Sequence, residues 1–173
     1  MSSSPAVSAC PISADVRDAA PPSPDTLAYS FTLPAGPVSS RIARAATRVA
    51  LQAHGLEGMT EAAVQVVAEL AACACRFTPD DASVYVSLRF REGALRVILY
   101  DGHPRHSHPR LAAACDARRR AALRVLACVV RVCEGDWGFG EAREPGGGTR
   151  MWAVLPWRGA RDFAAVGVGV RKG

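Results

Sequence analysis

The chain has 173 residues, 49% of them hydrophobic, and a formal net charge of +5. This length suggests one domain plus a tail, and the composition supplies enough apolar side chains for a core. The basic residues are scattered except in one run, so the charge indicates only a weak preference for anionic partners. No apolar stretch or leader pattern predicts a membrane span or signal peptide. The 6 cysteines lack zinc-knuckle spacing, which favours a reducing, cytoplasmic setting.

The first half of the chain contains clear secondary-structure patterns. Residues 1–25, rich in Ser, Ala and Pro, predict a disordered tail. Alternation predicts a strand over 27–33, and Ser39 or Ser40 can cap a helix that ends near Gly55. A second, almost wholly apolar helix is expected from Thr60 to Arg76. Two alternating segments, 82–91 and 94–100, predict a hairpin that turns at Glu92-Gly93.

The second half continues the same alternation of elements. A loop rich in His and Pro covers 101–109, and a third helix is expected over 116–133. Strands follow at 136–142 and 150–155, joined by a glycine-rich connection, and 159–173 reads as a tail. The domain therefore spans 26–158. The order predicts an α+β two-layer sandwich, with a mixed, mostly antiparallel sheet covered on one face by about three helices.

Three features offer chemistry, and each also has a purely structural explanation. The polar residues of the second helix form a stripe with Cys73 between them, which also describes the solvent side of an amphipathic helix. Asp101-Gly102 follows a strand and can accept hydrogen bonds or simply turn the chain. Glycines 146–148 before Thr149 allow close backbone approach, or make a flexible hairpin loop.

Two further clusters carry charge or metal-binding groups. The run Arg118 to Arg120 can meet phosphates or an acidic partner, although a solvated helix face is its usual explanation. His103, His106 and His108 share one loop, but without a rigid spacing they predict no metal site.

Three segments in order resemble the boxes of the histidine-kinase-like ATPases, the Bergerat ATP-binding fold, in its anti-sigma-factor serine kinase branch. They are VVAELAACACRF over 66–77, LYDGHPR over 99–105 and GGTRMWAVL over 147–155. The resemblance covers about residues 27–157 and rests on the order and spacing of the segments, since each motif alone is unspecific.

The resemblance implies roles for individual residues. Glu69 takes the position of the general base, and Asp101 takes the position that receives the adenine amino group, with Thr149 beside it. Gly102 and Gly148 line the approach of the nucleotide.

Departures from the family pattern weaken the implied ATP site. Cys73 stands where the family has its magnesium-binding Asn, and a neutral thiol is a poor ligand for a hard ion. Arg120 begins the segment that replaces the glycine-rich lid, whose backbone N–H groups would cradle phosphates. We therefore expect weak ATP binding or none, and magnesium binding is doubtful.

Three functions follow as hypotheses. The first is a regulatory protein that binds a protein partner, which the resemblance implies to be a sigma factor or an anti-anti-sigma protein. The second is an active ATP-dependent serine kinase that uses Glu69 as its base. The third is a basic nucleic-acid-associated protein, which the lack of interleaved aromatic residues disfavours. A homodimer is compatible with the resemblance.

Overall fold

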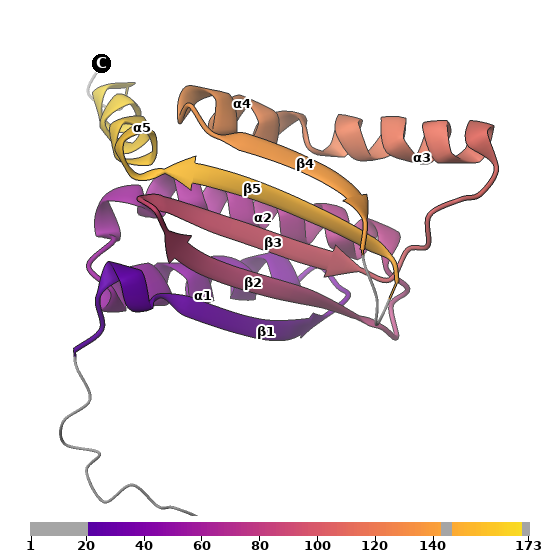
Figure 1. Cartoon of the computed structure of the whole chain (residues 1–173), viewed down its shortest axis with the longest axis horizontal. Coiled ribbons are helices and arrows are strands. Elements are labelled where there is room, and N and C mark those ends of the chain that lie inside the picture. The colour runs from indigo at the N-terminus through magenta and orange to yellow at the C-terminus, as the bar shows by residue number, and fades with distance from the viewer. Residues whose placement is uncertain (1–20, 143–146, 171–173) are drawn as a thin grey trace, which may run out of the picture.

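The computed structural model describes residues 21–142 and 147–170 (Figure 1). Most of the predicted N-terminal tail, residues 1–20, lies outside the described residues. The described chain begins with a short 3-10 helix, η2 (Pro24–Thr26), which leads directly into the first strand.

The described residues form one sheet of five strands, in the order β1-β2-β3-β5-β4. Every neighbouring pair is antiparallel, so the expected mixed character of the sheet is wrong, while the α+β class is confirmed. The hairpin β2–β3 turns at Glu92-Gly93, where both residues have positive φ (54° and 71°), as a tight two-residue turn needs. The strands are β1 (Ala28–Pro34), β2 (Ser83–Arg91), β3 (Ala94–Asp101), β4 (Asp136–Glu141) and β5 (Thr149–Pro156).

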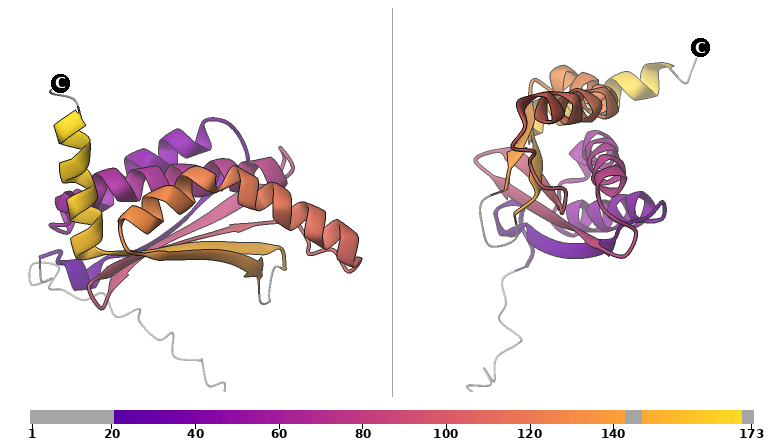
Figure 2. Two further views of the ribbon diagram at one scale, coloured as in Figure 1. Left: turned by 90° about the horizontal axis from the view of Figure 1, so that it is seen from above. Right: turned by 90° about the vertical axis from the view of Figure 1, so that its right-hand side faces the viewer.

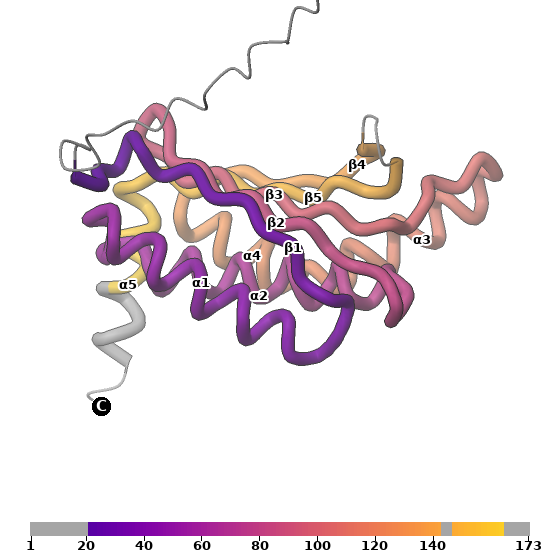
Figure 3. Tube along the Cα trace, turned by 90° about the horizontal axis from the view of Figure 1, so that it is seen from below, coloured from indigo at the N-terminus to yellow at the C-terminus, as the bar shows by residue number. Residues whose placement is uncertain are grey.

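Five α-helices accompany the sheet in the described chain, more than the expected three. Figure 3 shows α1, α2, α4 and α5 on the same face of the sheet, and Figure 1 shows α3 extending past its end, roughly in line with α4. The end-on view in Figure 2 shows this layering. The helices are α1 (Ser39–Ala53), α2 (Thr60–Phe77), α3 (Pro109–Ala122), α4 (Arg124–Val132) and α5 (Trp157–Val170), with a 3-10 turn η3 (Glu57–Met59) before α2.

Helix α2 is the centre of the core. Its length and composition, together with η3, match those of a membrane-spanning helix. In the fold, however, its apolar side chains pack against α1, α4, α5 and β3. Its small residues, such as Ala62, Ala71 and Ala74, are completely buried and allow close packing of the neighbouring elements.

Two predicted elements differ from the observed ones. The single helix expected over 116–133 is two helices that meet at Leu123, and the first begins seven residues earlier, with Pro109 in its first turn. The segment expected to be a C-terminal tail forms α5, which is held by the buried Ala160 and by the packing of Trp157 and Phe163 on the core. The sequence pattern missed α5 because Gly159, Gly167 and Gly169 interrupt the segment, and glycine is a poor helix former.

Helix starts also differ in detail. Neither Ser39 nor Thr60 caps its helix from outside, because each is the first helical residue. The Ser39 hydroxyl instead donates to the carbonyl oxygen of Pro34 at the end of β1, tying α1 to the strand.

Candidate functional site

A buried ion pair joins the end of β3 to α3. Arg119 Nη1 donates to Asp101 Oδ2 at 2.6 Å, and its Nη2 lies 3.5 Å from Oδ1. Asp101 Oδ1 also accepts the backbone N–H of His103 at 3.0 Å. Both side chains are almost fully buried, with 1% (Arg119) and 0% (Asp101) of their surface exposed. Both carboxylate oxygens are therefore engaged by groups of this chain.

The guanidinium of Arg119 fills the space beside Asp101. Its central carbon lies 3.9 Å from the centre of the Phe77 ring, a cation–π distance. Its Nη1 also contacts Met151 Sδ at 3.3 Å. Among the described residues, Arg119 Nε has no hydrogen-bond partner, and the charged group is buried against one carboxylate, one aromatic face and the Met151 sulfur.

Burial also governs the titration of the neighbouring groups. It raises the pKa of the Asp101 carboxyl above the usual range, and the hydrogen bonds and charge of Arg119 act against this shift. Burial raises the pKa of the Cys73 thiol to about 11, with Arg119 again opposing. Cys73 is consequently a neutral, buried thiol at neutral pH, unsuited to bind Mg²⁺.

The other residues predicted around Asp101 lie where the strand register places them. Thr149 on β5 pairs with Asp101 on β3, and its hydroxyl donates to the His103 carbonyl oxygen at 3.1 Å. Gly148 has a φ of +87°, and a Cβ there would lie 2.1 Å from the Asp101 carbonyl oxygen. Gly102 is exposed and open to solvent. The structure thus brings Cys73, Asp101, Gly148 and Thr149 together.

Glu69 and Arg120 lie apart from this group. Glu69 is half-buried, and its carboxylate accepts a hydrogen bond of 2.9 Å from Gln65, one turn earlier on α2. The Arg120 side chain is exposed and lies over Phe139, with 5.4 Å between its guanidinium carbon and the ring centre. Neither makes a contact with the Asp101–Arg119 pair among those described.

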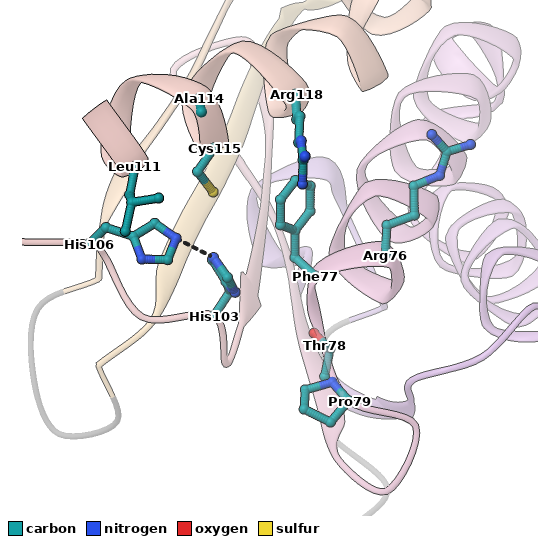
Figure 4. A pocket seen from close by; sticks show the side chains of 10 residues that line it. All are labelled: Arg76, Phe77, Thr78, Pro79, His103, His106, Leu111, Ala114, Cys115 and Arg118. Atoms are coloured by element: carbon teal, nitrogen blue, oxygen red, sulfur yellow. Dashed lines mark hydrogen bonds between the residues drawn. The ribbon is translucent and has the colours of Figure 1, made fainter. Parts of the chain in front are cut away.

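An open cleft of about 510 Å³ lies next to the pair, between the end of α2, the loop after β3 and α3 (Figure 4). His103 and His106 line it, with 3.3 Å between their Nε2 atoms. The Cys115 sulfur points from α3 toward both rings, and all three potential ligand atoms lie within 4.8 Å of one another. His108, the third histidine of the loop, is exposed and outside this group.

Sequence reasoning missed two of these residues. Arg119 stands between two exposed arginines on a helix, so its pattern indicated solvent, and only the packing of α3 over the end of β3 turns it inward. Cys115 falls just before the helix expected over 116–133, so no pattern in the sequence placed it beside the histidines. Eight residues lie between His106 and Cys115, and no regular spacing marks such a pair.

No known family model and no curated protein matches this sequence.

Proposed function

We propose that this protein acts by binding another protein, on a histidine-kinase-like ATP-binding fold whose nucleotide pocket is closed by its own arginine. The proposal combines the order of the three resembling segments with the contacts around Asp101. The partner class that the resemblance implies is a sigma factor or an anti-anti-sigma protein, which makes the role one of transcriptional regulation.

The observation that carries the proposal is the position of Arg119. Adenine recognition would need a free Asp101 carboxylate, but Arg119 and the His103 N–H occupy both of its oxygens. Breaking a buried ion pair costs about 3–5 kcal/mol. A hydrogen bond from the adenine amino group to a carboxylate contributes about 1.5–3 kcal/mol. Replacing the Asp101–Arg119 ion pair by a hydrogen bond to adenine is therefore unfavourable. Cys73 supplies no metal ligand and Arg120 no phosphate cradle that would offset this loss.

An apolar groove supports the binding of a protein partner. It runs between α1 and strands β1 and β2, and its lining includes Tyr29, Ile42 and Val49, which are 43%, 42% and 65% exposed. Helix α1, which forms one wall of the groove, also exposes three arginines on its solvent side and carries no acidic residue. Charge complementarity therefore favours an amphipathic partner segment with acidic residues flanking its apolar side chains.

Calorimetric titration with ATP, with and without Mg²⁺, tests the closed pocket. We expect no binding heat from the wild type at millimolar ATP. Binding that requires Mg²⁺ and weakens in Asp101→Asn would contradict the proposal and favour the kinase hypothesis. Circular dichroism of each variant establishes that it is folded.

Co-purification from the cells of origin tests the partner. We expect a sigma factor or anti-anti-sigma protein to be retained by the wild type and lost from Val49→Glu, which places a charge in the groove. The matched control is Val132→Glu, because Val132 is similarly exposed (56%) but lies on α4, outside the groove. Retention by Val49→Glu equal to the control would exclude the groove, and no retained partner under any growth condition would remove the proposal.

A further inference from the structure

The loop after β3 and helix α3 place two imidazoles and a thiol at one end of the cleft. His103 and His106 come from the loop and Cys115 from α3, and all three side chains are half-buried. Histidine nitrogen and cysteine sulfur are the ligand types that Zn²⁺ and related transition-metal ions prefer, whereas Mg²⁺ and Ca²⁺ prefer oxygen.

The spacing of the two imidazoles fits a shared metal ion. Zinc–nitrogen bonds are about 2.0–2.1 Å long, so two ligands in a tetrahedron lie about 3.3 Å apart. The Nε2 atoms of His103 and His106 are 3.3 Å apart. The Cys115 sulfur lies within 4.8 Å of them, and a side-chain shift of about 1 Å brings it to the separation that a zinc–sulfur bond requires.

The scaffold holds these side chains in place. Arg105 and Asp116 form a bidentate ion pair, with distances of 2.6 and 3.2 Å, between the loop and α3. Arg105 precedes His106 and Asp116 follows Cys115, so the pair fixes the two segments beside the ligands that each carries. Such preorganisation lowers the cost of assembling a site.

His103 is held on several sides. Its backbone N–H donates to Asp101, and its carbonyl oxygen accepts from Thr149. Its ring packs edge to face on Phe77.

We propose that His103, His106 and Cys115 form a binding site for a transition-metal ion, Zn²⁺ in the first instance, with its fourth position open to the cleft. Arg118 lines the same cleft and suits an anion or a water as the fourth ligand. The ion would clip the loop to α3, the helix that carries Arg119. This proposal does not depend on the proposed function.

Titration with Zn²⁺ and with Co²⁺ tests the site on the full chain purified without metal. We expect one Zn²⁺ per chain, and a thiolate-to-Co²⁺ charge-transfer absorption that reports the cysteine ligand. His106→Ala and Cys115→Ser should each weaken binding by more than the ~10–100-fold typical of outer-shell changes. Cys115→Ser should also abolish the charge-transfer absorption.

Matched controls come from the same segments of the chain. His108→Ala removes an exposed histidine of the same loop, and Cys128→Ser removes an exposed cysteine of α4. Both variants should bind Zn²⁺ as the wild type does.

The proposal fails if the wild type binds no stoichiometric metal, since the two imidazoles then simply share a hydrogen bond. It also fails if His106→Ala and Cys115→Ser bind as tightly as the controls. Circular dichroism of the metal-free variants separates lost ligands from lost folding.

Discussion

Asp101 and Arg119 depend on each other because neither charge is exposed to water. A buried pair is weak evidence for stability, since the cost of dehydrating both ions offsets their attraction. Removing one partner is different, because the remaining charge is then buried without compensation. The cation–π contact of Arg119 with Phe77 stabilises the folded protein only while the cation is present.

We predict that Arg119→Met lowers the free energy of unfolding by about 3–5 kcal/mol, since it leaves the Asp101 carboxylate unpaired. The double variant Arg119→Met with Asp101→Leu should recover most of this loss, because it removes both charges. Urea denaturation of the two variants and the wild type measures the effect.

The neighbouring residue provides the control for this measurement. Arg118→Met changes an exposed arginine on the same helix, and it should alter the free energy of unfolding by no more than about 0.5 kcal/mol. Equal losses in Arg118→Met and Arg119→Met would show that the buried pair is not what stabilises this region.

Gly148 gives a second test at the scale of single residues. We predict that Gly148→Ala lowers the free energy of unfolding by more than about 1 kcal/mol, because the new Cβ would collide with the Asp101 carbonyl oxygen at a φ of +87°. Gly102→Ala is the matched control, since no atom lies within 4 Å of its Cβ position. Thermal unfolding compares the two, and similar melting temperatures would contradict the close approach of β5 to β3.

The sequence could indicate some of these residues and not others. The resemblance implied that Asp101, Gly148 and Thr149 surround one nucleotide site, and the β3–β5 register places Asp101 opposite Thr149. The inward position of Arg119 could not be predicted. Charge pattern describes a helix face only when the orientation of the helix is known, and α3 has too few apolar residues to indicate it.

At the scale of elements, α3 is attached in an unusual way. Arg119 is its one buried residue among those described, so apolar burial contributes little to holding it. Its identified ties include the ion pairs Arg119–Asp101 and Arg105–Asp116, together with the contacts of Arg119 and Arg120 with aromatic rings. The sequence located the strands well from their alternation. It misplaced the start of α3 because the preceding His- and Pro-rich segment suggested a longer loop.

We predict that Arg105→Gln increases hydrogen exchange of the α3 amides without a comparable change in α2. The substitution removes the ion pair that joins the loop to α3, whereas α2 is held by buried apolar contacts. Exchange followed by mass spectrometry, with peptides from both helices, measures the difference.

Arg110→Gln is the control for the helix-docking prediction, because Arg110 is an exposed arginine in the first turn of α3. It should leave exchange in α3 close to that of the wild type. Equal increases in the two variants, or an increase shared by α2, would show that the Arg105–Asp116 pair does not specifically dock the helix.

For the whole molecule, the core consists of α2 packed between the sheet and the other helices. The β-α-α-β-β-α-β-β order that predicted the α+β class agrees with this arrangement, except that its third helix is divided into α3 and α4 and that α5 follows the last strand. The sequence could not predict the dehydration of particular polar groups inside the core. Cys73 illustrates this, since its position as a helical thiol gave no measure of how deeply it lies beneath the Asp101–Arg119 pair.

Because the Cys73 thiol is buried, the free energy of unfolding should depend on pH in the alkaline range. Burial raises the pKa of Cys73 from 9.0 to about 11, so the unfolded chain loses this proton first as the pH rises. We predict that the contribution of Cys73 to the free energy of unfolding is complete below pH 9 and is lost progressively toward pH 11. The loss of this contribution amounts to at most about 3 kcal/mol.

Urea denaturation at several pH values in this range measures the effect. The free energy of unfolding should decline less steeply with pH for Cys73→Ala than for the wild type. Cys128→Ala, which removes an exposed thiol, should follow the wild-type curve. Parallel curves for Cys73→Ala and the wild type would mean that Cys73 is hydrated in the folded protein, and the dehydrated surroundings of the Asp101–Arg119 pair would have to be revised with it.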